Sequence, residues 1–474
     1  MQELCICKSK VLYTACSMYG SVKRLEELEM LVEFSVKNYR SIKDKVTLSL
    51  TASSEDIHPG NVFSDPSGKV RLLKTAAIYG ANASGKSNVI MALQTMRQLV
   101  LKSHELQRGE KIDVIPFRLD PDTVEQPTEF EVVFIKDGRR FIYGFSADQY
   151  RVREEWLSEA NLDALKVAPR MLFHRELQSD GTYGDPKLGD YWKPKNRSLW
   201  NETNDNTLFL AKSAQNNHPH AAIVFDWFRR SFRTISSEPE NSAEMRWTAG
   251  LCERDPEVKS MIQAMLKDAD LGIEDFTCEK EPLEESRVWP QIQDELRLRL
   301  SPDLAVKHVS VYLQKVISKH LMADGVTHVD FDLKDNESDG TQRLFSLAGP
   351  FIHSLLNGNV LFCDELDSSL HPTLTRSLID MVHRHSGSFQ LIFTTHDSSL
   401  LDAELFRRDQ IWFTEKNRSM STDLYSLWDI KPRAGENFRK GYLNGRYGAI
   451  PFLGDFNLWE TEESRTRLAG VSHG

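Results

Sequence analysis

The chain has 474 residues, of which 40% are hydrophobic and 27% charged, with a formal net charge of −10 at pH 7. These values are typical of a water-soluble protein with two or three structural lobes. The sequence lacks the run of about 18 or more apolar residues that crosses a membrane, and its start does not resemble a signal peptide, so we expect a cytoplasmic protein without a membrane partner. The negative charge argues against indiscriminate binding of nucleic acid.

Residues 1–29 show no sustained period, and regular patterns begin just after them. Glu26 and Glu27 precede Met30 at a distance at which their codons can form a ribosome-binding sequence. We therefore predict that residues 1–29 are an N-terminal extension that is not native, and that translation naturally starts at Met30.

From residue 31 to residue 50, apolar and polar side chains alternate as in two strands joined by a turn. Arg40 and Ser41 lie at the polar tip of this hairpin. Two interpretations remain open, because these side chains either reach a bound nucleotide or form an ordinary hairpin corner.

Residues 80–87 carry the strongest motif, Gly-Ala-Asn-Ala-Ser-Gly-Lys-Ser, between a strand-like run at 73–79 and a helical pattern from residue 89. Glycines allow the main chain to curl around an anion, so that N–H groups and the helix N-terminus face phosphates. In this pattern the lysine reaches the terminal phosphates and the last serine ligates Mg²⁺. We predict a site for ATP and Mg²⁺ that comprises Gly80, Asn82, Gly85, Lys86, Ser87 and Asn88, with Arg40 and Ser41 beside it.

Residues 129–177 alternate in four strand-like segments, which predicts antiparallel β structure and an N-terminal ATPase lobe over residues 30–160. Residues 161–327 become irregular and then helical, notably at 258–266 and 290–321, so we predict a mostly helical insertion. Within it, Phe225–Arg233 interleaves aromatic and basic side chains. This segment is either an amphipathic helix or a face that binds nucleic acid or a partner.

Residues 328–474 alternate strands with helices, which predicts a C-terminal ATPase lobe with a mostly parallel sheet. A buried-strand run at 360–363 ends in Asp364 and Glu365, where parallel sheets present polar groups to ligands. Asp364 is suited to hold Mg²⁺ opposite Ser87, and Glu365 is suited to polarise the attacking water. His396 follows a second apolar strand, and we predict that it senses the γ-phosphate.

Ser338, Gly340 and Thr341 precede another helical run. Small hydroxyl and glycine residues at a helix N-terminus form an anion site. One nucleotide hardly needs two such sites in one subunit, so we expect this one to cap ATP that another copy of the chain holds.

Together these motifs resemble the ATP-binding-cassette (ABC) superfamily, in the branch of chromosome-maintenance and recombination-repair ATPases. The resemblance implies an α/β fold with an SMC/RecF-like P-loop ATPase core, an antiparallel β subdomain and an inserted helical lobe. It also implies an ATPase that works as a head-to-tail dimer, with the signature at 338–342 acting in trans and a D-loop at Asp367. This superfamily usually has a glutamine between the phosphate loop and the signature. Its position in this sequence is left open, and Gln126 is one candidate.

Four segments, at 34–41, 365–372, 408–413 and 442–451, are also similar to the abortive-infection ATPases called AAA15 or RloA, a family that includes the ATPase of the PARIS anti-phage system. This resemblance implies a homo-oligomeric scaffold that holds a separately encoded, toprim-type or nuclease-like toxic effector and releases it on infection, with a phage protein as the trigger. The alternative is a RecF/SMC-like repair ATPase that clamps DNA on ATP-driven dimerisation. Sustained heptads are missing between residues 86 and 364, which argues against long coiled-coil arms.

Overall fold

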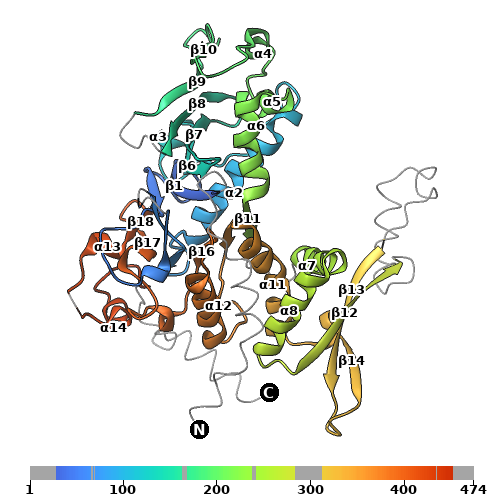
Figure 1. Ribbon diagram of the computed structural model, residues 1–474. Helices are drawn as coiled ribbons and strands as arrows, with labels where there is room; N and C mark the ends of the chain where they lie inside the picture. Colours follow the sequence, from blue (N-terminus) through green and yellow to red (C-terminus); the bar gives the residue numbers. More distant parts are fainter. Residues whose placement is uncertain are drawn as a thin grey trace, which may run out of the picture.

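The computed structural model describes residues 28–65, 68, 70–162, 168–236, 242–282, 312–433 and 435–451, and two large sheets dominate it (Figure 1). The predicted N-terminal extension lies outside these ranges except for its last two residues. Leu28 is buried, and the Glu29 carboxylate accepts hydrogen bonds from Lys136 and Ser231. The natural start at Met30 stays a prediction.

The first sheet is antiparallel, with the strand order β10-β9-β8-β7-β6-β1-β2. Its strands are β1 (Met30–Lys37), β2 (Val46–Ser49), β6 (Thr128–Lys136), β7 (Arg139–Ala147), β8 (Val152–Asn161), β9 (Arg170–Glu176) and β10 (Lys187–Leu188). Asp137 and Gly138 join β6 to β7 with φ of 50° and 69°, the left-handed pair that a tight hairpin turn requires. The predicted antiparallel β structure is therefore confirmed. A separate small hairpin pairs β3 (Val62–Ser64) with β4 (Arg71–Leu73).

The second sheet has the order β11-β15-β16-β5-β17-β18 and is parallel except for its last strand. Its strands are β5 (Thr75–Gly80), β11 (Phe232–Ile235), β15 (Val360–Cys363), β16 (Gln390–Thr394), β17 (Ile411–Lys416) and β18 (Thr422–Ser426). Every residue of β5, β15 and β16 is buried, as expected for a parallel sheet that is covered on both faces. The predicted mostly parallel sheet is confirmed.

The parallel sheet separates two hydrophobic cores. Ala76 and Ile78 of β5 belong to one core and Ala77 and Tyr79 to the other, because successive strand residues face opposite sides. The first core lies between the two large sheets and contains α2 (Lys86–Lys102). The second contains residues of α7 (Ser242–Arg254), α8 (Pro256–Asp268), α11 (Asp339–Asn357) and α12 (Pro372–Arg384). The parallel sheet therefore lies between two hydrophobic cores, one on each of its faces.

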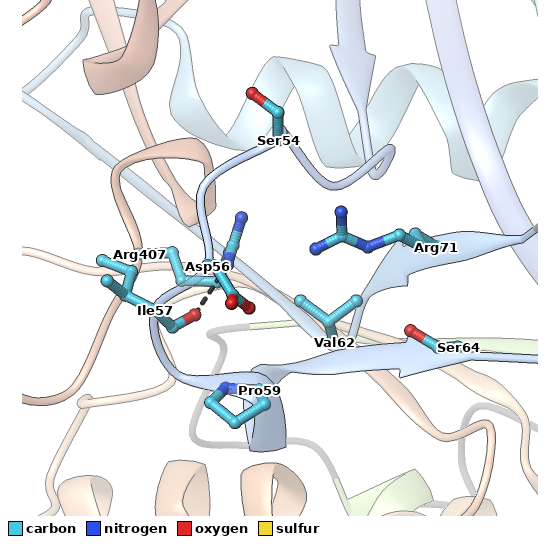
Figure 2. Close-up of a pocket in the computed structure, with 8 residues that line it drawn as sticks. All are labelled: Ser54, Asp56, Ile57, Pro59, Val62, Ser64, Arg71 and Arg407. Carbon is cyan, nitrogen blue, oxygen red and sulfur yellow. Dashed lines mark hydrogen bonds between the residues drawn. The ribbon is translucent and has the colours of Figure 1, made fainter. Parts of the chain in front are cut away.

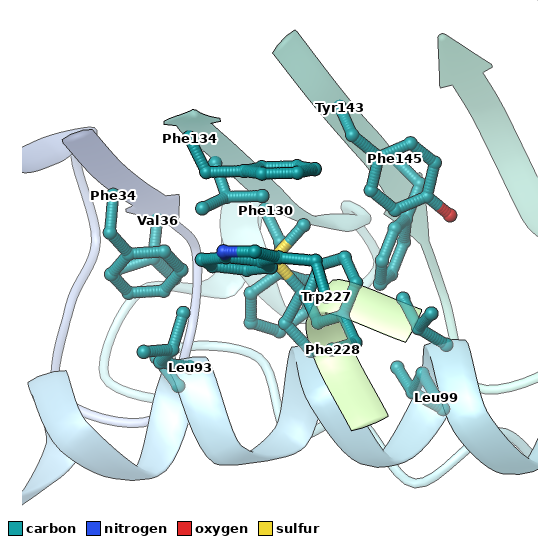
Figure 3. Close-up of a cluster of buried hydrophobic side chains, with 14 of the residues drawn as sticks. Phe34, Val36, Leu93, Leu99, Phe130, Phe134, Tyr143, Phe145, Trp227 and Phe228 are labelled. Carbon is teal, nitrogen blue, oxygen red and sulfur yellow. The ribbon is translucent and has the colours of Figure 1, made fainter. Parts of the chain in front are cut away.

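The aromatic and basic segment Phe225–Arg233 is only partly helical. α6 (Pro219–Asp226) continues into a π-helical turn at Trp227–Ser231, and β11 begins at Phe232. Trp227 stacks on Phe134 with ring centroids 4.1 Å apart, inside the first core (Figure 3). The prediction of an amphipathic helix is wrong from residue 232. From that residue the chain pairs with β15 as the edge strand of the parallel sheet.

The interval 161–327, predicted to be mostly helical, combines helices with strands. Its helices within the described residues are α4 (Arg197–Asn201), α5 (Phe209–Gln215), α6, α7 and α8. The helical pattern at 258–266 lies in α8 and is confirmed. The pattern predicted over 290–321 is wrong where it is described, because Tyr312–Leu321 forms the strand β13. Residues 290–311 lie outside the described ranges.

The reason lies in the packing of β13 between β12 (Ile273–Pro282) and β14 (His328–Asp332). Val316 and Ser318 are buried, so the alternation has the period of a strand. The three strands form an antiparallel sheet that extends away from the rest of the protein (Figure 1).

The remaining α-helices of the described residues are α3 (Pro121–Val124), α10 (Leu333–Asn336), α13 (Leu427–Ile430) and α14 (Phe438–Leu443). Within the described ranges, none of the helices has the length and apolar character that a bilayer crossing needs.

Candidate nucleotide-binding site

The predicted phosphate loop joins β5 to α2, because β5 ends at Gly80 and α2 begins at Lys86. Gly85 precedes the helix with a φ of 106°, which strains any residue with a side chain. A Cβ at Gly85 would lie 2.1 Å from the Thr422 hydroxyl, and one at Gly80 would lie 2.4 Å from the Thr414 hydroxyl. Both glycines of the motif are therefore required by the packing of β17 and β18 against the loop.

Lys86 is buried within the loop. Its ammonium donates hydrogen bonds to the carbonyl oxygens of Gly80 at 2.8 Å and Ala81 at 3.1 Å. Burial lowers the pKa of Lys86 to about 8, and the carboxylates of Glu365, Asp364 and Asp367 oppose that shift. The loop thus encloses a cation that carboxylates of the C-terminal lobe stabilise.

Ser87 and Asp364 meet across the sheet, as the sequence predicts. The Ser87 hydroxyl donates to Asp364 Oδ1 at 3.1 Å, and the Thr394 hydroxyl donates to the same oxygen at 2.6 Å. A hydroxyl and a carboxylate oxygen are ligands that Mg²⁺ prefers, and most of its remaining ligands are usually water and substrate phosphate. The oxygen pair therefore fits the predicted magnesium site.

Thr394 was not predicted as a site residue, yet it contacts both the Asp364 carboxylate and the main chain of Glu365. Its oxygen accepts a hydrogen bond from the Glu365 N–H at 2.7 Å while donating to Asp364. Glu365 has a φ of 50°, a left-handed conformation that is costly for a residue with a side chain. A hydroxyl at the end of an apolar strand, one strand away from Asp-Glu, is the sequence signal that could have identified Thr394.

Arg343 is a second residue that sequence reasoning missed. It lies on α11, is 8% exposed, and donates to the carbonyl oxygens of Asp364 and Glu365, each at 3.3 Å. It also donates to the carbonyl oxygen of Ser236 at 3.0 Å. A buried guanidinium needs such acceptors, so Arg343 ties the helix of the predicted signature to the turn that carries the predicted catalytic carboxylate, Glu365.

His396 and Asp367 lie together beyond the ends of the parallel strands. The His396 N–H donates to Asp367 Oδ2 at 3.3 Å. Partial burial and the nearby Lys86 lower the pKa of His396, against the opposing carboxylates of Asp367, Glu365 and Asp364. The neutral imidazole that this shift favours keeps one N–H donor, which is what a phosphate sensor needs.

The hairpin tip reaches the loop through Ser41 rather than Arg40. Ser41 Oγ accepts a hydrogen bond from the Asn88 amide at 2.6 Å and lies 2.8 Å from the Thr422 hydroxyl. The Arg40 side chain instead donates to the Tyr39 hydroxyl. Asn82 is exposed at the tip of the loop. Ser41 and Asn88 thus belong to the cluster that supports the loop, while the predicted nucleotide contacts of Arg40 and Asn82 stay predictions.

The predicted signature occupies the start of α11. Ser338 is the N-cap, and its hydroxyl accepts a hydrogen bond from the Thr341 N–H at 3.3 Å. A Cβ at Gly340 would lie 2.8 Å from the carbonyl oxygen of Ser369, so the D-loop packs directly on the signature. Within the described ranges, no hydrogen bond joins the signature residues to the phosphate loop of the same chain. Gln126 is exposed, and its carbonyl oxygen accepts from Asn38.

A cavity of about 490 Å³ lies away from these motifs (Figure 2). It is lined by Ser54, Asp56, Ile57, Pro59, Val62, Ser64, Arg71 and Arg407. Arg407 is already occupied, because its guanidinium binds Asp409 and the carbonyl oxygens of Glu55 and Ile57. The cavity contains none of the predicted nucleotide-binding residues.

The sequence matches the family described as "AAA domain, putative AbiEii toxin, Type IV TA system" at residues 76–241 and 283–402. The matched ranges cover more than half of the chain and include the phosphate loop, the signature, both carboxylates and His396. The chain belongs to this family. Membership identifies the protein as a P-loop ATPase of a family linked to toxin–antitoxin systems. Among curated proteins there is no match.

Several solved structures are similar to the chain at low identity. The SMC head domain from Thermotoga maritima has 13% identity, with 84% of this chain and 98% of that chain covered and a TM-score of 0.38. SmcHead bound to the C-winged helix domain of ScpA has 12% identity, coverages of 84% and 98%, and a TM-score of 0.38. The Smc head domain with an extended coiled coil, bound to the C-terminal domain of ScpA derived from Pyrococcus furiosus, has 13% identity, coverages of 84% and 96%, and a TM-score of 0.38. Such TM-scores are too low to support an inference about this chain.

Proposed function

We propose that the protein is an ABC-type ATPase of an abortive-infection defence system, which binds and hydrolyses ATP. The hydrogen bonds around Asp364 carry this proposal, because the Ser87 and Thr394 hydroxyls both donate to Asp364 Oδ1 and Thr394 also accepts from the Glu365 N–H. They support a Mg²⁺ ligand pair and a candidate base next to the phosphate loop. This combination is suited to phosphoryl transfer, which needs positioning and charge stabilisation more than covalent chemistry.

ATP binding would use the loop first. Main-chain N–H groups between Gly80 and Ser87 surround the phosphates, and the Lys86 ammonium exchanges its carbonyl acceptors for phosphate oxygens. Ser87 and Asp364 would hold Mg²⁺, which would supply positive charge to neutralise the phosphates. Asn88 and Ser41 keep the first turn of α2 in place.

Hydrolysis would then require both lobes and a second copy of the chain. Glu365 orients the attacking water and accepts its proton, and His396 donates a hydrogen bond to the γ-phosphate. Ser338, Gly340 and Thr341 of the other copy cap the same nucleotide, so two ATP molecules lie between two head-to-tail subunits. Asp367, whose carboxylate accepts a hydrogen bond from the His396 N–H, would link one site to the other.

The defence role rests on membership of a family with a type IV toxin–antitoxin link and on the resemblance to AAA15/RloA ATPases. Within that family we propose a protein like AriA of the PARIS system. It would form a homo-oligomeric scaffold that holds a toprim or nuclease-like, AriB-like effector and releases it when a phage protein is sensed. Co-purification of such an effector with the native protein, without added nucleic acid, would support this role.

Glu365→Gln tests the ATPase mechanism. The amide keeps the size of the side chain but removes the base, so we expect kcat to fall by about 10²- to 10⁴-fold while ATP binding is retained. ATP should then trap the closed dimer in size-exclusion chromatography. Glu279→Gln is the matched control, because Glu279 is exposed on β12. Native turnover in Glu365→Gln would refute the assigned base.

The alternative function, DNA binding, can be tested in the ATPase assay. The rings of Trp227, Phe228 and Phe232 are fully buried and cannot stack on bases. The exposed Arg229 and Arg230 both pair with Asp226. We therefore expect ATP turnover to be unchanged by added double-stranded DNA, and a large stimulation would favour the RecF/SMC-like alternative.

A further inference from the structure

Glu337 lies between α10 and α11, directly before the signature N-cap Ser338. Its side chain is 9% exposed. One carboxylate oxygen accepts hydrogen bonds from the His320 Nε2 and from the Ser318 hydroxyl, both at 2.5 Å and both on β13. A largely buried carboxylate with two short hydrogen bonds is held in one position, because losing either partner would leave a buried polar group unpaired.

The main chain around Glu337 is also fixed. The side-chain amide of Gln342 donates to the carbonyl oxygens of Glu337 and Lys334, each at 3.0 Å. The Gln342 N–H donates to the Ser338 carbonyl oxygen at 3.0 Å. The turn before the signature is therefore clamped between the first turn of α11 on one side and β13 on the other.

Ser338 itself is exposed at the end of this support. An exposed residue on a clamped turn is suited to meet a ligand from outside the subunit, and its hydroxyl is already held in place by Thr341. The three-stranded sheet of β12, β13 and β14 extends from the body of the protein beside this turn (Figure 1). The position of that sheet thus decides where the signature lies.

We infer that Glu337 is a positioning residue, which fixes the signature against ATP held by a second copy through its contacts with β13. This inference rests on the proposed function, because it assumes that the signature completes a site in trans. Glu337 would act through its neighbour Ser338 rather than by contact with ATP. A misplacement of about 1 Å at a reacting site can cost about 100-fold in rate, so the clamp matters for turnover more than for binding.

Glu337→Ala tests the inference in the full chain. We expect kcat to fall at least 10-fold while the Kd for ATP stays near the native value. The melting temperature should also fall, because Ser318 and His320 lose their buried acceptor. Glu337→Gln should restore part of the rate, since an amide oxygen still accepts both hydrogen bonds. Glu279→Ala, on the same sheet, should behave like the native protein. If Glu337→Ala does not fold, His320→Asn is used in its place, because it removes the hydrogen bond to Glu337 from the β13 side.

A mixing experiment separates positioning in trans from a general structural effect. Lys86→Ala lacks a working loop but keeps its signature, and Glu337→Ala has the reverse defect. Their mixture should be more active than the sum of the two separate proteins, because an intact loop then meets an intact signature. A native kcat for Glu337→Ala overturns the inference while the proposed function stands. A mixture without gain overturns the inference together with the proposed cap in trans, while ATP hydrolysis itself stands. A native protein that neither binds nor hydrolyses ATP refutes the proposed function itself.

Discussion

The protonation of Lys86 leads to a quantitative prediction about ATP binding. Burial brings the pKa of the Lys86 ammonium down to about 8, from its ordinary value of 10.5. Because the pKa is lowered, the charge on Lys86 is lost as the pH rises through about 8 rather than above 10. Phosphate binding needs the charged form, so affinity should fall over the same range.

The magnitude follows from the pKa. A group with a pKa of about 8 is roughly 90% charged at pH 7 and roughly 10% charged at pH 9, so the affinity for ATP should fall about 10-fold between these values, or by about 1.4 kcal/mol. Above pH 8, each binding event should also take up close to one proton, because the bound phosphates favour the ammonium.

Isothermal titration calorimetry with a non-hydrolysable ATP analogue measures both quantities, in two buffers of different ionisation enthalpy between pH 7 and pH 9.5. Lys86→Arg is the control, since its guanidinium stays charged throughout this range and should give a flat profile. A native Kd that does not change up to pH 9.5, with no proton uptake, would show that the loop does not lower the pKa of Lys86.

Three further predictions concern catalysis and stability. Thr394→Val removes the 2.6 Å hydrogen bond to Asp364 and the acceptor of the Glu365 N–H, so kcat should fall roughly 10- to 100-fold and more Mg²⁺ should be needed in the ATPase assay. Gly349→Val would place a Cβ 2.3 Å from the Thr248 hydroxyl, between α11 and α7, and should lower the free energy of unfolding in denaturant by about 1–3 kcal/mol. Burial lowers the pKa of His383 to about 3, so below pH 6.5 the unfolded state binds more protons and the free energy of unfolding should fall on acidification by up to about 1.4 kcal/mol per pH unit. His383→Gln should reduce that slope in urea titrations at pH 7 and pH 5.

The sequence was sufficient where function depends on residues close together in the chain. The phosphate loop is one continuous run between a strand and a helix, and the fully buried β5, β15 and β16 follow directly from their apolar runs. Asp364, Glu365 and His396 could be placed because polar residues at the carboxyl ends of parallel strands gather at one edge. Local pattern was not sufficient for β13, where the spacing of apolar residues also suited a helix and the partner strands decided the outcome.

The nucleotide motifs, and the strands and helices that carry them, could be identified from local patterns in the sequence. The tertiary structure alone decided that Thr394 joins Asp364 to Glu365, that Arg343 ties α11 to them, and that Glu337 is held by β13. These contacts join segments that are distant in the chain, and their distances depend on how sheets and helices pack. The periodicity of a sequence indicates which face of a helix or strand is buried. It does not indicate which polar group of another segment that face will contact.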